Sequence, residues 1–347
     1  MTVAAEVRTH LARHVGPLLP LVGAVAMGFG VCGLIVLWVG LSPSLMFRQL
    51  IKGAVEGPQL FETVARAVPL VGMTLAAAIP LRAGIVNLGA DGQLVLGGCA
   101  AAIVALYFPA PDFLRLVMAL AAGMVVGASY AAIAAAGEIY AGVPLLLSTW
   151  LLTYPAKGLC GYLVRTSLRD PLTAWPSTAR IAVGARLGSL IPGTPVNQGF
   201  LLVAVVAAAV IFVDRRSSIG FELRLRGLNE RFARYGGVAL HRQTLGVMIA
   251  SGAVAGLVGA IMVLGSQFRY TDGALTAPQY SWSGTLAALL AGGEPLGSVV
   301  AAVLFAALQT GGFAMERSVE IPRVLTMVLQ SVVILFLAMR GAIWKRS

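Results

Sequence analysis

Charged residues are scarce in this sequence. Only 11% of its 347 residues are Asp, Glu, Lys or Arg, whereas 58% are hydrophobic. Soluble domains carry about a quarter charged residues. A water-exposed surface cannot be built from so few ionisable groups, so the composition excludes a soluble globular protein. We predict an all-α, polytopic membrane protein instead.

The motifs of enzymes are absent as well. The sequence has no G-x-x-x-x-G-K-[ST] phosphate loop, no H-E-x-x-H zinc motif and no G-x-S-x-G nucleophile elbow. Its three cysteines share no short spacing, which excludes a disulfide framework or a zinc site of the usual kinds. We therefore expect a protein that is not an enzyme and holds no metal or cofactor of its own. These cysteines are Cys32, Cys99 and Cys160.

Long apolar stretches are what the sequence does have. A transmembrane helix needs about 20 mostly apolar residues, and close helix packing in membranes uses Gly and Ala, which are frequent here. Two stretches are divided only by residues 292–295, so they could form one broken helix or a tight hairpin. We expect ten spans, near 18–40, 63–81, 85–107, 113–136, 143–164, 199–213, 243–265, 282–292, 296–313 and 322–339.

The net charge of +11 is unevenly distributed. Basic residues gather in segment 214–242 and at both termini. Cytoplasmic segments of membrane proteins hold such an excess of Lys and Arg, and ten spans would place all three regions in the cytoplasm. Segment 165–198 also holds four arginines, but long loops follow the rule less strictly, and we expect it to be an ordered periplasmic segment. The charge therefore indicates membrane topology, with no nucleic-acid partner.

A short helix is predicted within the basic loop. Asn229 is a good N-cap, Glu230 complements the helix dipole, and two glycines at 236 and 237 supply a left-handed stop. One face carries Phe232 and Tyr235, and another carries two arginines. Such a helix could dock into the groove of a partner protein or lie among lipid headgroups, and spacing alone leaves both open. The helix comprises Asn229, Glu230, Arg231, Phe232, Ala233, Arg234, Tyr235 and Gly236.

A polar cluster interrupts a glycine-rich apolar stretch at Asn87, Asp91 and Gln93. Non-helical backbone at membrane depth is tolerated only where it is buried in protein or lines a cavity. These residues could line a translocation path and bind a polar solute in passing. They could equally cap a helix break and satisfy the backbone groups that the break leaves free.

Aromatic and amide residues gather at the expected outer ends of the seventh and eighth spans. Aromatic side chains at such positions are usually interface anchors, which is the interpretation we favour. Docking of a receptor protein is the alternative. The residues are Gln267, Tyr270, Gln279, Tyr280 and Trp282.

An ion-gradient-driven secondary transporter is the rival function. Such carriers place ionisable relay groups inside the helix bundle. The candidates here lie near the ends of the expected spans, and this scarcity of acids at depth disfavours proton coupling. They are Arg66, Arg82, Asp91, Glu138 and Glu294.

Four blocks of the sequence resemble one family of transport proteins. Residues 82–98 (RAGIVNLGADGQLVLGG) resemble the "RAG-xx-NIG-x-EGQ-xxx-G" block of permeases of the branched-chain amino acid and simple-sugar ABC importer family. Residues 220–237 resemble its "GFELRAVGxNPxAARYAGI" segment, 251–265 its "SGALAGLAGAxEVLG" block, and 287–297 its "AVALLGGxxPLG" block. The blocks follow the family's order, and the match is closest to the nucleoside branch that works with basic-membrane-protein-type receptors.

The resemblance implies a function and a set of partners. The helix at 229–236 would be the coupling helix that docks on an ABC ATPase, which would itself bind ATP and Mg. A second permease, more often a related chain than an identical one, and a periplasmic or lipoprotein solute receptor would complete the importer. The solute would be a nucleoside or another small polar molecule such as a simple sugar or nucleobase.

The implied architecture is one permease domain over residues 1–347 in a bacterial inner membrane, with both termini cytoplasmic. Ten helices would form two pseudo-repeated halves, 63–164 and 243–340. Residues 1–62 would form the N-terminal tail and first helix, 165–198 the periplasmic segment and 214–242 the coupling loop.

The sequence departs from the family pattern in two places. Asp91 stands where the family has Glu, which keeps the charge and shortens its reach. Pro144 and Leu145 stand where the family has an Asn-Glu pair, and Thr153 replaces a later Asn. Any solute or gate contact that those polar groups make in relatives must be made differently here.

Overall fold

The computed structural model describes residues 30–31, 33–38, 40, 42–319 and 328. The first and last predicted spans, 18–40 and 322–339, lie mostly outside these residues, as do both termini. Within the described part the chain is helical, with no strand beyond two isolated bridges, Ser177 to Thr271 and Ser189 to Asn197. The predicted all-α class is therefore confirmed.

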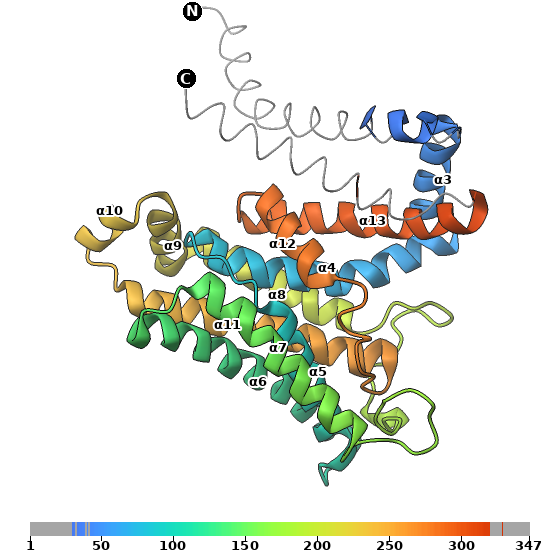
Figure 1. Ribbon diagram of the computed structural model, residues 1–347, viewed down its shortest axis with the longest axis horizontal. Coiled ribbons are helices and arrows are strands. Elements are labelled where there is room, and N and C mark those ends of the chain that lie inside the picture. Colours follow the sequence, from blue (N-terminus) through green and yellow to red (C-terminus); the bar gives the residue numbers. More distant parts are fainter. Residues whose placement is uncertain (1–29, 32, 39, 41, 320–327, 329–347) are drawn as a thin grey trace, which may run out of the picture. The chain divides into compact units, whose positions relative to one another are not determined.

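The helices follow the apolar stretches closely (Figure 1). By length and composition alone, five of the described helical segments could cross a membrane: Pro58–Arg82, Ala90–Tyr107, Asp112–Ala141, Leu240–Gln267 and Pro295–Arg317. The predicted total of ten spans stays a prediction. The elements are α3 (Pro43–Val55), α4 (Pro58–Arg82), α5 (Ala90–Tyr107), α6 (Asp112–Ala141), α7 (Leu145–Arg165), α8 (Gly199–Arg216), α9 (Ser218–Leu228), α10 (Glu230–Tyr235), α11 (Leu240–Met262), α12 (Tyr280–Leu290) and α13 (Pro295–Val319), with a 3-10 turn at Val183–Ala185 and a π-helical turn at Val263–Gln267.

The chain divides into two compact units. The larger is Phe61–Ala306, and the other combines residues 1–60 with 307–347. In the smaller unit, α3 packs on the end of α13, where Gly53 lies against Ala314 and Gly311 against the backbone of Leu50. The predicted single permease domain and its two pseudo-repeated halves stay predictions.

The centre of the larger unit is the packing of α5, α6 and α11. Gly127 of α6 lies against Gly252 and Gly256 of α11, and Gly97 of α5 also meets Gly256. A Cβ atom added at any of these glycines would collide with backbone of a neighbouring helix. Small residues let membrane helices approach this closely, so the glycines determine how the three helices pack.

Two chain breaks shape the bundle. Between α4 and α5, Gly84 has a positive φ of 75° and residues 85–88 are not helical, so the expected span 85–107 begins as a helix only at Ala90. Between α12 and α13, Gly292 and Gly293 both have positive φ and end one helix before Pro295 begins the next. The pair at 282–292 and 296–313 is therefore two helices joined by a turn.

The two ends of the larger unit differ in character. Figure 1 shows α9 and α10 at one end and the segment between α7 and α8 at the other. That segment is ordered by backbone hydrogen bonds, with Thr178 N donating to Tyr270 O and Ile181 N to Phe268 O, both at 2.9 Å. We call the first the α9–α10 end and the second the loop end.

The interface-anchor interpretation is wrong for two aromatic residues at the loop end. Tyr270 is 1% exposed and Tyr280 is 6% exposed, because the segment between α7 and α8 folds over this region and α4 packs beside it. Trp282 is 58% exposed and fits the anchor role by position. The sequence predicted that these side chains lie near the ends of two spans. Which of them are buried depends on the segment between α7 and α8 that covers this region.

Candidate functional site

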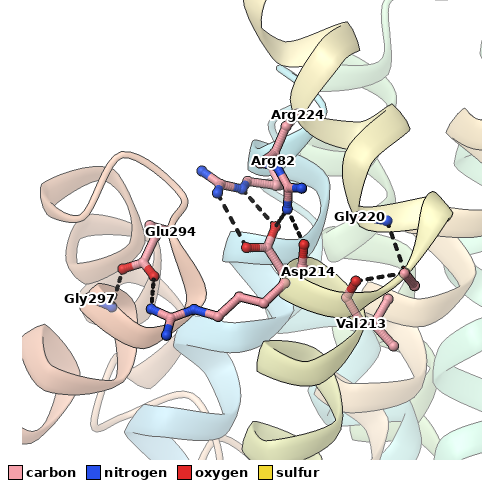
Figure 2. Close-up of polar contacts among 9 residues, drawn as sticks. Arg82, Val213, Asp214, Gly220, Arg224, Glu294 and Gly297 are labelled. Atoms are coloured by element: carbon pink, nitrogen blue, oxygen red, sulfur yellow. Dashed lines mark hydrogen bonds and ion pairs between the residues drawn. The ribbon is translucent and has the colours of Figure 1, made fainter.

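The α9–α10 end is held together by one buried carboxylate. Asp214, at the end of α8, receives Arg82 Nε on Oδ1 at 2.8 Å and Arg82 Nη2 on Oδ2 at 3.2 Å. Arg224 of α9 lies 3.5 Å from Oδ1 and also donates to the Asp214 carbonyl. Figure 2 shows both arginines converging on this acid. We call Arg82, Asp214 and Arg224 the charged joint, because it links the ends of α4 and α8 to α9.

Each end of α9 packs against one of the two helices that the charged joint connects, α8 at its start and α4 at its end. Ser217 caps its N-terminus by accepting a hydrogen bond from Gly220 N at 3.1 Å. Gly220 lies against the backbone of Asp214, and Gly227 lies against the Arg82 carbonyl, with no room for a Cβ at either glycine. Backbone contact therefore ties the start of α9 to α8 and its end to α4, and the Arg224–Asp214 ion pair adds a second link to α8.

A second arginine ties α9 to α11. Arg226 is buried and donates from Nη1 to Leu240 O at 3.1 Å and to Thr244 Oγ1 at 2.9 Å. Burial lowers the pKa of this guanidinium, and the nearby Glu230 carboxylate acts in the opposite direction. Helix α9 is thus connected to three long helices, so a displacement of α9 would be passed to all of them.

A separate ion pair lies at the start of α13. Glu294 accepts from Arg215 Nη2 at 3.0 Å and from Gly297 N at 2.6 Å, so it caps α13 (Figure 2). Of the ionisable groups considered as carrier relays, Arg82, Asp91 and Glu294 are therefore ion-paired in this structure.

The short helix in the basic loop forms where it is predicted. Asn229 caps α10 by accepting from Phe232 N at 3.0 Å, which confirms the predicted N-cap. Phe232 is 60% exposed and Tyr235 is 92% exposed. The left-handed stop is at Gly237, with φ 85°, whereas Gly236 has φ −74°. The prediction was wrong on Gly236, because one more residue with ordinary backbone follows α10 before the stop.

The polar cluster predicted in the glycine-rich stretch is split by the structure. Asn87 and Gln93 are buried and joined by a hydrogen bond of 3.0 Å, and Asn87 Nδ2 also donates to Ser251 Oγ of α11 at 2.9 Å. Asn87 Oδ1 accepts from Gly89 N, which caps the break before α5. The geometry of Asn87 and Gln93 favours bracing of the break, and their role along a path stays a prediction.

Asp91 points elsewhere, to Lys157 of α7. The two side chains form an ion pair of 3.1 Å and are 27% and 39% exposed, while Asp91 Oδ1 has no hydrogen-bond partner among the described residues. Tyr154 and Trp150 lie one and two turns before Lys157 on the same face of α7, with ring centroids 6.3 Å apart, and are 60% and 50% exposed. We call Trp150, Tyr154 and Lys157 the α7 face.

Sequence reasoning missed Asp214, Arg224 and Lys157. A signal was present for Asp214, since it is the one acid between an apolar run and a pair of arginines. Lys157 is one of three lysines in the chain and interrupts an apolar stretch, which also singles it out. Across the described residues, no three His, Cys, Asp or Glu side chains come together to hold a metal ion.

Apolar helices long enough to cross a bilayer, joined by an ion-paired loop of short helices, define a multi-pass helical membrane protein. The chain belongs to the family described as the branched-chain amino acid transport system permease component, whose model matches residues 59–338. It is an ABC transporter permease, and nothing in the comparisons supports the ion-gradient-driven carrier.

Three relatives illustrate the range of the family. The glucose ABC transporter permease protein TsgB13 of Haloferax volcanii is 34% identical over 288 residues, which cover 80% of this chain and 75% of the relative. The guanosine ABC transporter permease protein NupP of Bacillus subtilis is 29% identical, with 94% of both chains covered. The nucleoside ABC transporter permease protein NupB of Lactococcus lactis is 27% identical and covers 93% of this chain and 91% of its own.

Proposed function

We propose that this chain is the membrane-spanning permease of an ATP-driven importer for nucleosides or related small polar solutes. Its partners would be an ABC ATPase that binds ATP and Mg, a second permease, and a receptor that delivers the solute. The relatives that match over more than nine-tenths of the chain are named as guanosine and nucleoside permeases. A relative named as a glucose permease keeps simple sugars within the solute class.

The α9–α10 end is proposed to face the cytoplasm of a bacterial cell. Segment 214–242 carries seven arginines and is the densest basic stretch of the chain. The excess of Lys and Arg on the cytoplasmic side of membrane proteins supports this orientation, with both termini on the same side and the loop end facing the periplasm.

The main observation behind the proposal is that α10 exposes aromatic side chains, whereas the neighbouring α9 is bonded to the long helices. Helix α10 exposes Phe232 and Tyr235, which offer apolar area to a partner's groove. Helix α9 is bonded to α4, α8 and α11 through the charged joint and Arg226. When ATP binding closes the ATPases, α10 would move with them, and α9 would transmit that movement to the three spans.

The solute path is proposed to run along the α7 face. An ionisable pair within the membrane almost always faces the bundle interior, a protein interface or water, because its exposure to lipid is costly. Lys157 lies in the body of α7 and is partly exposed with Asp91 in the isolated chain. A second permease opposite this face would enclose a polar path, with Asp91 as its acidic group.

Docking on the ATPase can be tested by co-purification. We expect the tagged chain, isolated from native membranes in mild detergent, to bring down an ATPase and a second permease. An Arg231→Ala, Phe232→Ala, Arg234→Ala triple variant should lose the ATPase, because α10 loses one exposed aromatic and both arginines while its Asn229 cap remains. Arg169→Ala, an exposed arginine of the loop end, is the matched control and should keep it.

Two results would contradict the proposal. One is a wild-type chain that purifies alone and drives uptake from an ion gradient in vesicles. The other is retention of the ATPase by the triple variant at the wild-type level.

The path can be tested by adding bulk to the α7 face. Gly158 lies one residue after Lys157, and a side chain placed there meets open space. Gly158→Trp should therefore leave the fold intact and lower solute uptake about tenfold or more, a rise of about 1.4 kcal/mol in the transport barrier. Gly137→Trp on α6, where space is also open, should transport normally. Equal uptake by both variants, at equal abundance, would place the path elsewhere.

A further inference from the structure

A cavity of about 620 Å³ opens between the ends of α4, α8, α9 and α11. This volume falls within the range of about 300–1,000 Å³ that is usual for sites of small organic ligands. Its walls are mostly apolar, with Ile79 of α4, Val210 of α8 and Val247 of α11 among them. The cavity is half-enclosed, so a ligand could enter from one side.

Three polar side chains that line this cavity have no partner among the residues that the structure describes. Within that part of the chain, neither amide atom of Gln243 has a hydrogen bond, although both are buried, and neither Arg242 nor Glu222 forms an ion pair. Buried polar groups in proteins are nearly always hydrogen-bonded. Because the Gln243 side chain lines the cavity and its amide has no bond to break, a rotation of that side chain would bring the amide to a ligand that supplies the missing acceptor and donor.

The place of the cavity in the fold selects the kind of ligand. Helix α8, which forms one wall, exposes Val205 and Phe212 on its outer side, as a lipid-facing span does. The cavity lies at the α9–α10 end, where the spans finish and the basic loop begins. Apolar walls at that level suit an acyl chain, and charged groups at their ends suit the headgroup of the same lipid.

The charges at the cavity select the headgroup. Arg242 offers a bidentate donor for a phosphate, and Glu222 offers an acceptor for an ammonium group. An anionic lipid would meet Arg242 favourably and Glu222 unfavourably, whereas a zwitterionic lipid with a primary amine complements both. We propose that this cavity binds one phospholipid of the phosphatidylethanolamine type, with its phosphate on Arg242, its amine on Glu222 and its glycerol ester region on the Gln243 amide.

Such a lipid would also support the charged joint. Arg82 and Asp214 both line the cavity, so the bound lipid lies against the ion pair that links α4 to α8. It would exclude water from that pair and hold the ends of α4, α8 and α11 at a fixed spacing. The binding site itself does not depend on the proposed import function; its effect on coupling does.

Filling the cavity is the direct test. Gly246 lines the cavity, and a Cβ added there meets nothing within 4 Å, so Gly246→Phe should occupy the space without disturbing the helix. The full-length protein would be purified with its associated subunits in mild detergent and its bound lipid measured by native mass spectrometry. We expect about one phosphatidylethanolamine per wild-type chain, the same for Gly137→Phe, and at least a tenfold loss for Gly246→Phe.

The headgroup assignment is tested by comparing the retention of different lipids. In vesicles of defined composition, phosphatidylethanolamine should be retained over phosphatidylglycerol, which lacks the amine, and over phosphatidylcholine, whose quaternary ammonium cannot donate a hydrogen bond. Glu222→Gln should remove that preference, and Arg242→Gln should weaken retention of all three lipids. Equal retention of the three lipids by the wild type would overturn the proposal.

Other occupants would be recognised in the same experiment. Retention of lipid by Gly246→Phe would show that the lipid binds elsewhere. Loss of bound nucleoside, rather than lipid, in that variant would assign the cavity to solute. A photo-cross-link from position 246 to a polypeptide would assign it to a protein segment. Each of these outcomes overturns the lipid site, and none of them bears on whether α10 docks on an ATPase.

Discussion

Replacing Asp214 by alanine is expected to abolish ATP-driven solute uptake and to destabilise the chain by about 3–5 kcal/mol, the usual result of breaking a buried ion pair. The Asp214 side chain is 7% exposed and pairs with Arg82, which is 22% exposed, and Arg224, which is 33% exposed. Without the carboxylate, two guanidinium groups lie close together with no counter-charge. Helix α9 and helix α4 both lose the ion pair that links each of them to α8.

The measurement is uptake by the complete transporter in proteoliposomes, together with thermal unfolding in detergent. Asp272→Ala is the matched control, since its partner Arg165 is 66% exposed and such solvent-exposed pairs contribute about 1 kcal/mol or less. To separate folding from coupling, Arg82→Gln with Asp214→Asn removes one charge of each sign. We expect this double variant to recover much of the stability but little of the uptake. Wild-type uptake by Asp214→Ala would refute the role of the charged joint.

Gly127→Val is expected to prevent stable folding of the larger unit. A Cβ at Gly127 would collide with the backbone of Gly252 and Gly256, where α6 and α11 touch. Backbone cannot rotate away as a side chain can, so the helices would have to separate and lose the contacts between them. Overpacking of a core typically costs about 1–3 kcal/mol, and a clash of three carbon atoms with backbone should reach the upper end or exceed it.

The same helix provides the control. Gly137 of α6 has open space around its Cβ position, so Gly137→Val should be present in membranes at the wild-type level. Abundance of each variant in membrane fractions and its unfolding temperature in detergent would be compared. Equal stability of the two variants would mean that α6 and α11 are not packed glycine to glycine.

Local features were predictable from the sequence because their causes are local. The apolar runs at 143–164 and 199–213 became α7 and α8 with ends shifted by no more than three residues. Transfer of apolar side chains from water into lipid depends on the composition of a continuous stretch, which the sequence displays directly. The Asn229 cap was predictable for a similar reason, since a cap bonds a backbone group three residues away.

The candidate site was predicted only in part. Asn87, Asp91 and Gln93 are close in sequence, and proximity favoured a single cluster. In the structure Asn87 belongs to a non-helical segment and faces Ser251, whereas Asp91 lies in the first turn of α5 and faces Lys157. The change from non-helical chain to helix between them turns the two side chains in different directions.

The helical membrane class, the resemblance to an ABC permease family, the position of most helices and the loop that carries α10 were all predictable from the residues alone. The packed fold was needed to show that Asp214 joins Arg82, 132 residues away, that Asp91 joins Lys157, 66 residues away, and that a cavity lies beside the charged joint. Membrane insertion responds to the residues of one stretch, whereas an ion pair between helices depends on the angle and depth at which whole helices pack. That angle and depth depend on contacts such as the one between Gly127 and Gly252, whose two residues are far apart in the sequence.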